Sequence, residues 1–325
     1  MSKGQKKRES IYHRYSANLN NYFESIGQQL LWVENGAVSV KNDAYICPLC
    51  YEVFFAHHLI ESPTDNFLTL EHNPPKCMGG PKAVLTCKKC NNKNGAEYDD
   101  LVKKLLVTES FLYSNQSSLD ARFTINGHSI GGRIIKAGTK KGVAPNPNSN
   151  PRAYQELSDA ISAGKPINIE HTLTSPDWKD YSMGMLKMAY LKAFELFGYH
   201  FADFGNGANI RAVLHGEAMY PTINNGVIDI FASEDYVGVN VVVEPKELKA
   251  LVITLPLHFK HDRNIVKKNV PVILPAPFEG GWEMLSNYNN YVNKMVAYKT
   301  ARYTIPTKPL PYNRDYHLMF SDRLA

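Results

Sequence analysis

The cysteines constrain this chain more than any other feature, because all five lie between positions 47 and 90 of its 325 residues. Four of them form two Cys-x-x-Cys pairs, Cys47 with Cys50 and Cys87 with Cys90. Each pair places two thiolates on one side of a tight turn, and two such turns complete the four-sulfur shell of a structural Zn2+ site. A redox motif needs only one pair on a βαβ scaffold, which the flanking pattern does not predict. We therefore expect one structural zinc ion per chain.

Three further residues beside the two pairs are alternative ligands. Cys77 joins the cluster only if one of the four ligands is misassigned, and we expect it to be a small side chain in a loop. His57 and His58 follow an apolar run, which favours strand or loop positions over metal ligation. Because four thiolates fill a tetrahedral shell, the expected metal has no open position and holds the segment together without taking part in catalysis.

Composition narrows the class of protein. With 44% hydrophobic and 21% charged residues the chain reads as a folded protein, and its length predicts about two domains. Its apolar runs fall short of the about 20 residues that a membrane helix needs, and no apolar run follows the basic N-terminus. We expect a cytoplasmic protein with no membrane partner. The net charge of +5 is too small by itself to indicate a nucleic-acid binder.

Hydrophobic periodicity predicts an α+β chain. Apolar spacing predicts helices over 10–33 with a stop at Gly36, over 88–107 with a bend or late start at Gly95, and over 182–197 with a stop at Gly198. Strand-like runs lie at 122–125, 133–135, 227–231, 237–243, 251–257, 270–274 and 295–303, with a loop or link at 143–151. Prolines limit 270–274 to an edge strand or a brief one. We expect a basic tail and helix in 1–40, a small zinc-clipped finger in 41–110 and a larger α+β domain in 111–325.

The segment between the two cysteine pairs carries the residues that indicate chemistry. It contains LTLEHNPP, with Glu71 and His72, then Gly79-Gly80 and a VLTC strand, and Asn91 follows the second pair. This order resembles the HNH endonucleases, whose ββα-metal finger is often clipped by two Cys-x-x-Cys pairs. It is most similar to a bacterial subgroup with the pattern LTLEH-x-PP…GG…LTC-x-x-CN, and the match covers residues 41–105.

The resemblance implies a metal-dependent nuclease that hydrolyses DNA phosphodiester bonds, by nicking or by double-strand cleavage. It assigns His72 as the general base, which suits an imidazole because its pKa lies near neutral pH. Glu71 and Asn91 would hold the catalytic divalent ion, and their oxygen ligands favour Mg2+. On a regular strand Glu71 and His72 point to opposite faces, so Glu71 reaches the ion only if the strand end bends. The prolines that follow make such a bend plausible.

The motif departs from the family pattern at two positions. The family commonly has Asp where this chain has Glu71, and an Asn that supports the histidine-bearing loop aligns with Lys82. The third family position is Asn91 by alignment on the preceding cysteine, with Asn92 and Asn94 as alternatives. An Asn there disfavours tight Zn2+ or Ni2+ binding at the catalytic site.

Five lysines and no acidic residue lie in the window 76–93, which makes this window a candidate phosphate-binding face: Lys76, Lys82, Lys88, Lys89 and Lys93. A solvated helix edge is the alternative interpretation. We expect DNA as the partner, gripped through its backbone with little sequence readout.

Residues 111–325 carry no chemical motif, and their histidines are expected to be structural or surface residues: His200, His215, His258 and His261. Solitary HNH proteins of this size often serve bacterial antiviral defence or restriction, which implies a protein partner or an activating ligand at this region. Two other functions stay open. In the first, the chain is a non-catalytic zinc finger module that binds nucleic acid or protein. In the second, it is a defence effector that is silent until a partner or ligand switches it on.

Overall fold

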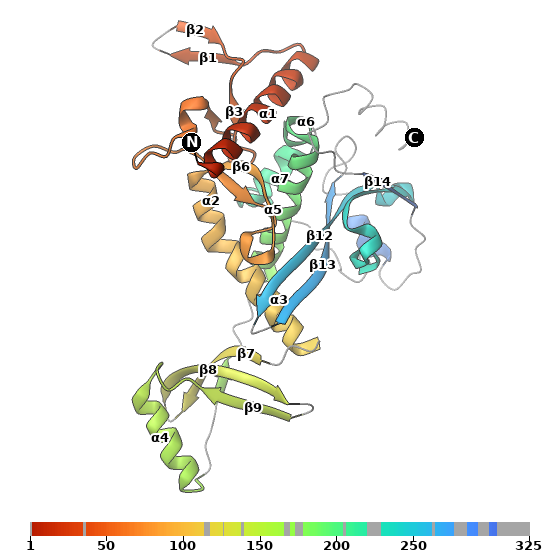
Figure 1. Cartoon of the computed structure of the whole chain (residues 1–325). Coiled ribbons are helices and arrows are strands. Elements are labelled where there is room, and N and C mark those ends of the chain that lie inside the picture. Colours follow the sequence, from red (N-terminus) through yellow and green to blue (C-terminus); the bar gives the residue numbers. More distant parts are fainter. Residues whose placement is uncertain are drawn as a thin grey trace. The chain divides into compact units, whose positions relative to one another are not determined.

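The computed structural model shows a mixed α+β protein (Figure 1). It describes residues 2–34, 37–113, 118–125, 127–137, 140–165, 170–172, 178–203, 206–219, 229–261, 264–275, 285–291 and 299–303. Contacts divide the chain into two compact units: unit 1 is 1–99, 182–259 and 267–325, and unit 2 is 100–181 and 260–266. Helices from the later part of the chain share unit 1 with the cysteine-containing segment.

Helix α1 (Lys3–Ser25) opens unit 1, and it corrects the predicted helix over 10–33 at both ends. The helix begins early because the Ser2 side chain accepts a hydrogen bond from the backbone N–H of Gln5. Its first turns are polar, so hydrophobic periodicity could not reveal them. It ends before Gly27, which has a φ of 67°. Residues Leu31–Glu34 form strand β1 and pair with β2 (Ala37–Val40), and the predicted stop at Gly36 lies outside the described residues.

Two short antiparallel hairpins and a helix follow in chain order. Strand β3 (Tyr45–Ile46) pairs with β4 (Val53–Phe54), and β5 (Leu68–His72) pairs with β6 (Lys82–Cys87). Helix α2 (Lys88–Asn94) begins directly after β6. A π-helical turn over Gly95–Asp99 separates it from α3 (Asp100–Tyr113), so the predicted interruption at Gly95 is confirmed.

Helix α5 (Trp178–Phe197) is the buried centre of unit 1 from residue 183 onward, as its apolar circumference predicts. The Phe194 ring stacks on Tyr15 of α1 with ring centroids 4.8 Å apart. Gly198 ends α5 with a φ of 61°, and a Cβ there would lie 2.0 Å from Oδ1 of Asn18. Helices α6 (Tyr199–Asp203) and α7 (Gly207–Leu214) follow this confirmed stop.

Unit 1 also holds most of a four-stranded sheet of order β13-β12-β11-β14: β11 (Gly238–Glu244), β12 (Ala250–His261), β13 (Asn264–Pro275) and β14 (Lys299–Tyr303). Its core cluster includes Phe231, Val252, Ile273 and Tyr288. Strand β13 lies at the edge, as its prolines predict, although it is longer than the predicted 270–274. Asp229–Ala232 is a 3-10 turn, so the described part of 227–231 is not a strand. Residues 227–228 and 295–298 lie outside the described residues.

Unit 2 holds a sheet of order β10-β7-β8-β9: β7 (Ser118–Ile125), β8 (His128–Ala137), β9 (Lys140–Pro145) and β10 (Glu170–Thr172). Helix α4 (Pro151–Ser162) packs on it around Phe123, Ile130, Ala153 and Leu157. The predicted link over 143–151 is wrong in its first residues, which end β9. Among the described residues, no helix has the length and apolarity to cross a membrane.

Candidate metal centre and histidine site

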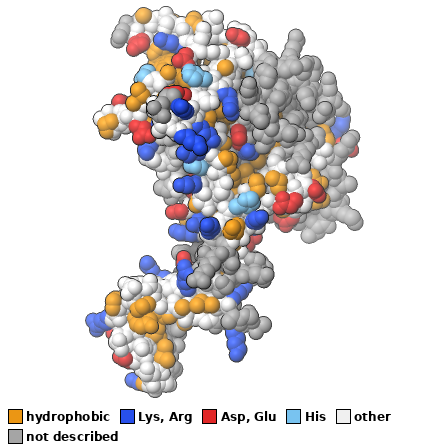
Figure 2. Space-filling view, viewed as in Figure 1, with side chains coloured by type: hydrophobic (Ala, Val, Ile, Leu, Met, Phe, Trp, Pro, Cys, Tyr) orange, Lys and Arg blue, Asp and Glu red, His pale blue; other side chains and the backbone are white. Residues whose placement is uncertain are grey.

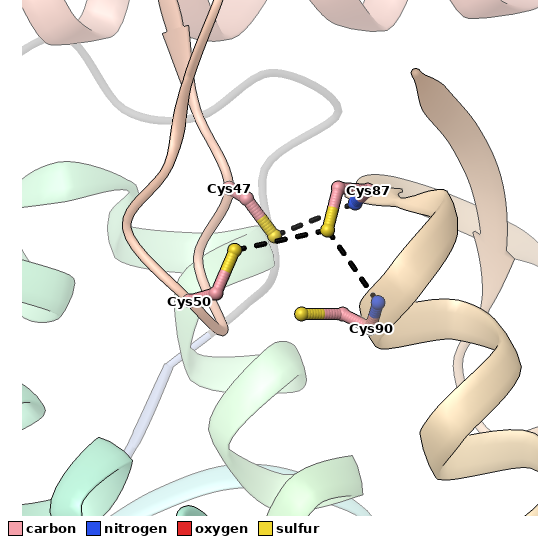
Figure 3. Close-up of side chains that lie close together, drawn as sticks. All are labelled: Cys47, Cys50, Cys87 and Cys90. Atoms are coloured by element: carbon pink, nitrogen blue, oxygen red, sulfur yellow. Dashed lines mark hydrogen bonds between the residues drawn. The ribbon is translucent and has the colours of Figure 1, made fainter. Parts of the chain in front are cut away.

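The two Cys-x-x-Cys pairs come together in space (Figure 3). Cys47 and Cys50 lie in the turn between β3 and β4, while Cys87 ends β6 and Cys90 lies in the first turn of α2. All four Sγ atoms lie within 4.8 Å of one another, and those of Cys50 and Cys87 are 3.7 Å apart. A tetrahedron with Zn–S bonds of about 2.3 Å has edges of roughly 3.8 Å. The group can therefore hold a metal ion, and its donors are those of structural zinc.

Burial and mutual hydrogen bonds shift the pKa values of these thiols in opposite directions. Cys47 and Cys87 are fully buried. Burial raises the pKa of Cys47, whereas hydrogen bonds from the neighbouring thiols, that of Cys47 first, lower the pKa of Cys87. The alternative ligands lie outside this group: Cys77 is exposed in a 3-10 turn (Lys76–Met78), and His57 and His58 lie in the turn Ala56–Leu59.

Side chains from the later helices hold the backbone of the first cysteine turn. The Tyr199 hydroxyl donates to the carbonyl oxygen of Ile46 at 2.7 Å and accepts from its N–H at 2.8 Å. The Tyr190 hydroxyl donates to the carbonyl oxygen of Pro48 at 2.7 Å. Nε2 of His215 lies 2.9 Å from the carbonyl oxygen of Leu49. The sequence pattern did not predict these contacts. Its only related signal was Tyr190, a tyrosine within the apolar helix predicted over 182–197.

His72 lies at the end of β5, half-buried, in a hairpin that leads directly into α2. The strand register changes there, from Glu71 opposite Val84 to His72 opposite Lys82. Such an irregularity bends the strand at the position where the sequence required a bend. Burial lowers the pKa of His72, and Lys82 lowers it further, while Glu71 opposes them. A lowered pKa favours the neutral imidazole, which is the form that accepts a proton.

Glu71 is buried, with 3% of its surface exposed, and both of its oxygens are engaged. Oε1 lies 3.0 Å from Nζ of Lys187 in α5, and Oε2 accepts a hydrogen bond from Oγ1 of Thr86 at 3.2 Å. Lys187 is 1% exposed and also lies 3.4 Å from Oδ1 of Asp99. A divalent ion on this carboxylate would lie beside the buried ammonium of Lys187, a like charge, so the expected catalytic ion does not fit Glu71 in this arrangement. The available sequence signal was Lys187, a charged residue between Leu186 and Met188 in the apolar helix predicted over 182–197.

Asn91 lies in the first turn of α2 and is held against the hairpin. Its Nδ2 donates to Oγ1 of Thr69 at 2.8 Å, and that hydroxyl donates across the strands to the carbonyl oxygen of Thr86 at 3.1 Å. Thr69 and Glu71 share one face of β5, because side chains alternate along a strand. Asn92 is exposed, and the side chain of Asn94 is not among those described.

The five lysines of the window 76–93 are all exposed, so each is available to a partner. Figure 2 shows Lys and Arg side chains gathered on the side of unit 1 that carries β6 and α2. Lys82 lies opposite His72, and Lys76 and Lys7 are close enough to lower its pKa. Positive charge therefore surrounds the imidazole.

Paired glycines close the loop between His72 and β6. A Cβ on Gly80 would lie 1.5 Å from the carbonyl oxygen of Pro74, and Gly79 has a φ of 84°. The tight path brings the Asn73 N–H to the carbonyl oxygen of Pro81 at 3.0 Å. Both glycines are required by geometry, which gives the Gly-Gly element of the motif a structural reason.

Comparison with known proteins adds nothing to these observations. No family model, no curated protein and no solved structure matches this chain. The resemblance to the HNH endonucleases therefore rests on the sequence motif.

Proposed function

We propose that this chain is an HNH-type endonuclease that hydrolyses DNA phosphodiester bonds with His72 as the general base. The observation that carries the proposal is a half-buried histidine at the end of a hairpin that runs directly into a helix. Exposed Lys82 and Lys76 lie near that imidazole, and a four-cysteine group joins the hairpin–helix junction to the preceding turn. If Glu71 and His72 were only a solvent-exposed loop pair, neither the nearby lysines nor the cysteine group would be needed.

In the proposed reaction His72 takes a proton from water as the water oxygen attacks phosphorus. The bond from phosphorus to the 3′-oxygen breaks in line with the attack, and the 3′-oxygen leaves. Lys82 and Lys76 bind the phosphate charge near the imidazole. Glu71 and Asn91 would be the residues to hold a divalent ion such as Mg2+ only after the Lys187–Glu71 pair is broken, and such an ion would supply charge stabilisation at the leaving oxygen. While that pair is intact, the proposed proton transfer and phosphate binding use only side chains of this chain.

The four-cysteine group is proposed to hold one structural Zn2+ per chain. Its ligands come from the turn before the hairpin and from the junction of β6 with α2. The ion would fix the start of α2, and with it Asn91, against strand β5. Small segments of this kind gain folding free energy from the metal that their own apolar burial does not supply.

The test compares plasmid nicking by the wild-type protein, His72→Ala and His128→Ala, each with Mg2+. His128 lies in unit 2 with 44% of its side chain exposed, so it serves as a matched control. Removal of a general base costs about 10²–10⁴-fold in rate, and the control should leave the rate unchanged. Unchanged nicking by a folded His72→Ala protein would refute the mechanism.

A non-catalytic module that binds nucleic acid is the second candidate, favoured by the exposed lysines alone. It predicts salt-dependent DNA binding by wild type and His72→Ala alike, with no nicking by either protein.

A bacterial antiviral defence or restriction role, with a partner or ligand acting at residues 111–325, is a further part of the proposal. It predicts that cells producing the wild-type chain resist phage and that cells producing His72→Ala do not. Equal plaque numbers on both strains would reject that role.

A further inference from the structure

A buried cation already lies against the carboxylate that is proposed to hold the catalytic ion. Nζ of Lys187 lies 3.0 Å from Oε1 of Glu71, and the two side chains are 2% and 4% exposed. The ammonium is also 3.4 Å from Oδ1 of Asp99, so carboxylates lie on two sides of it. Water cannot screen this pair, because neither side chain reaches the solvent.

A second cation on Glu71 would be placed beside a like charge. A metal ligated by either oxygen of this carboxylate lies within a few ångströms of Nζ of Lys187, and the low dielectric of the interior strengthens that repulsion. The other oxygen is no free alternative, since it accepts the Thr86 hydroxyl. Ammonium and divalent ion therefore compete for one carboxylate.

We propose that Lys187 is a resident counter-cation that excludes divalent ions from Glu71, so that a metal binds there only when the Lys187–Glu71 pair is broken. The inference rests on the proposed function for the assignment of Glu71 as a metal ligand. Helix α5 would control metal binding at Glu71, because it carries Lys187.

Helix α5 also forms a hydrogen bond with Asn73, the residue that follows His72. The carbonyl oxygen of Met188 accepts a hydrogen bond from Nδ2 of Asn73 at 2.9 Å, and Asn73 follows His72 in the chain. A displacement of this turn of α5 would release Glu71 and alter the backbone beside His72 together. Such coupling gives the expected activating partner or ligand a physical point of action.

The experiment measures Mn2+ binding by the loss of the free-ion paramagnetic resonance signal in the full-length protein. The variants are Lys187→Met, Lys187→Met with Glu71→Gln, and Glu71→Gln alone. Lys192→Met is the matched control, because Lys192 lies on the same helix and pairs with Glu195 at 2.7 Å. Circular dichroism and zinc content report whether each variant is folded.

Lys187→Met should bind Mn2+ at least about tenfold more tightly than wild type, and adding Glu71→Gln should abolish that gain. Lys192→Met should match the wild type. In the wild-type background Glu71→Gln should change the affinity less than about twofold, because Lys187 occupies the carboxylate. A folded Lys187→Met with unchanged affinity overturns the proposal.

If Lys187→Met does not fold, Glu71→Gln alone still tests the proposal. A tenfold loss of Mn2+ affinity on Glu71→Gln alone would show that Glu71 binds metal while Lys187 is present, and it would overturn the proposal. No arm measures DNA cleavage. A chain with the expected Mn2+ pattern and no nicking would refute the nuclease and retain the role of Lys187.

Discussion

Tyr199→Phe removes one oxygen atom, and that atom serves both backbone groups of Ile46. The Tyr199 hydroxyl donates to the Ile46 carbonyl oxygen and accepts from the Ile46 N–H, and Tyr199 is fully buried. Leaving a buried donor or acceptor without its partner costs about 1–3 kcal/mol. Two such groups give about 2–6 kcal/mol, with the lower end applying if a water molecule enters the space.

Ile46 directly precedes Cys47, so this cost falls on the turn that carries two of the four thiols. Release of a bound metal from a closed four-ligand site requires local opening of that turn. A loss of about 2 kcal/mol raises the open fraction roughly 30-fold, since 1.4 kcal/mol corresponds to a factor of ten. We therefore expect zinc to leave Tyr199→Phe at least about 30-fold faster than wild type.

Zinc transfer to a chromogenic chelator measures this rate. Tyr154→Phe is the matched control, because Tyr154 lies on α4 in unit 2 and is 36% exposed. Tyr190→Phe should fall between the two, since its hydroxyl donates one bond to the turn, to the Pro48 carbonyl oxygen. Equal release rates for folded Tyr199→Phe and Tyr154→Phe would refute the claim that the later helices hold the metal centre.

Three other predictions follow from the site. Because burial and Lys82 lower the pKa of His72, nicking should hold its rate as the pH falls to about 6.5 and decline only below that value; a decline that starts above about pH 7 contradicts the assignment. Cys47→Ser combined with Cys50→Ser should lose the zinc found by metal analysis of wild type, and zinc retained in that variant would reject the ligand set. Replacing exposed Lys88 and Lys89 by Gln should weaken DNA binding and reduce the slope of log affinity against log salt by about 1.8, with an unchanged slope as the contrary result.

The local parts of this molecule could be predicted from the sequence. Two Cys-x-x-Cys pairs brought their four sulfur atoms together as expected, because tight turns fix each pair and the metal chemistry of thiolates fixes their number. The apolar helix over 182–197 and its stop at Gly198 were also confirmed, since a full apolar circumference and a glycine at the end are local signals.

The contacts that join distant segments could not be predicted. Tyr199 bonds Ile46 across 153 positions, and Lys187 pairs with Glu71 across 116 (187 minus 71), spacings with no periodic signature. The start of α1 was missed because its first turns are polar and its signal is a single capping serine. Propensity and spacing describe one element at a time, so they cannot predict which carboxylate pairs with which lysine.

These long-range contacts determine what kind of unit the cysteine segment is. Its first turn is held by Tyr190, Tyr199 and His215, all from beyond residue 182, and its buried acid Glu71 is paired with Lys187 of α5. A segment cut at residue 110 would lose every one of these partners and expose the buried Glu71. Helix α5 therefore contacts the histidine site directly, through Lys187 on Glu71 and the Met188 carbonyl oxygen on Asn73. The candidate site shares unit 1 with helix α5 and the other later segments of that unit, so the motif alone could not reveal the side chains that hold the site.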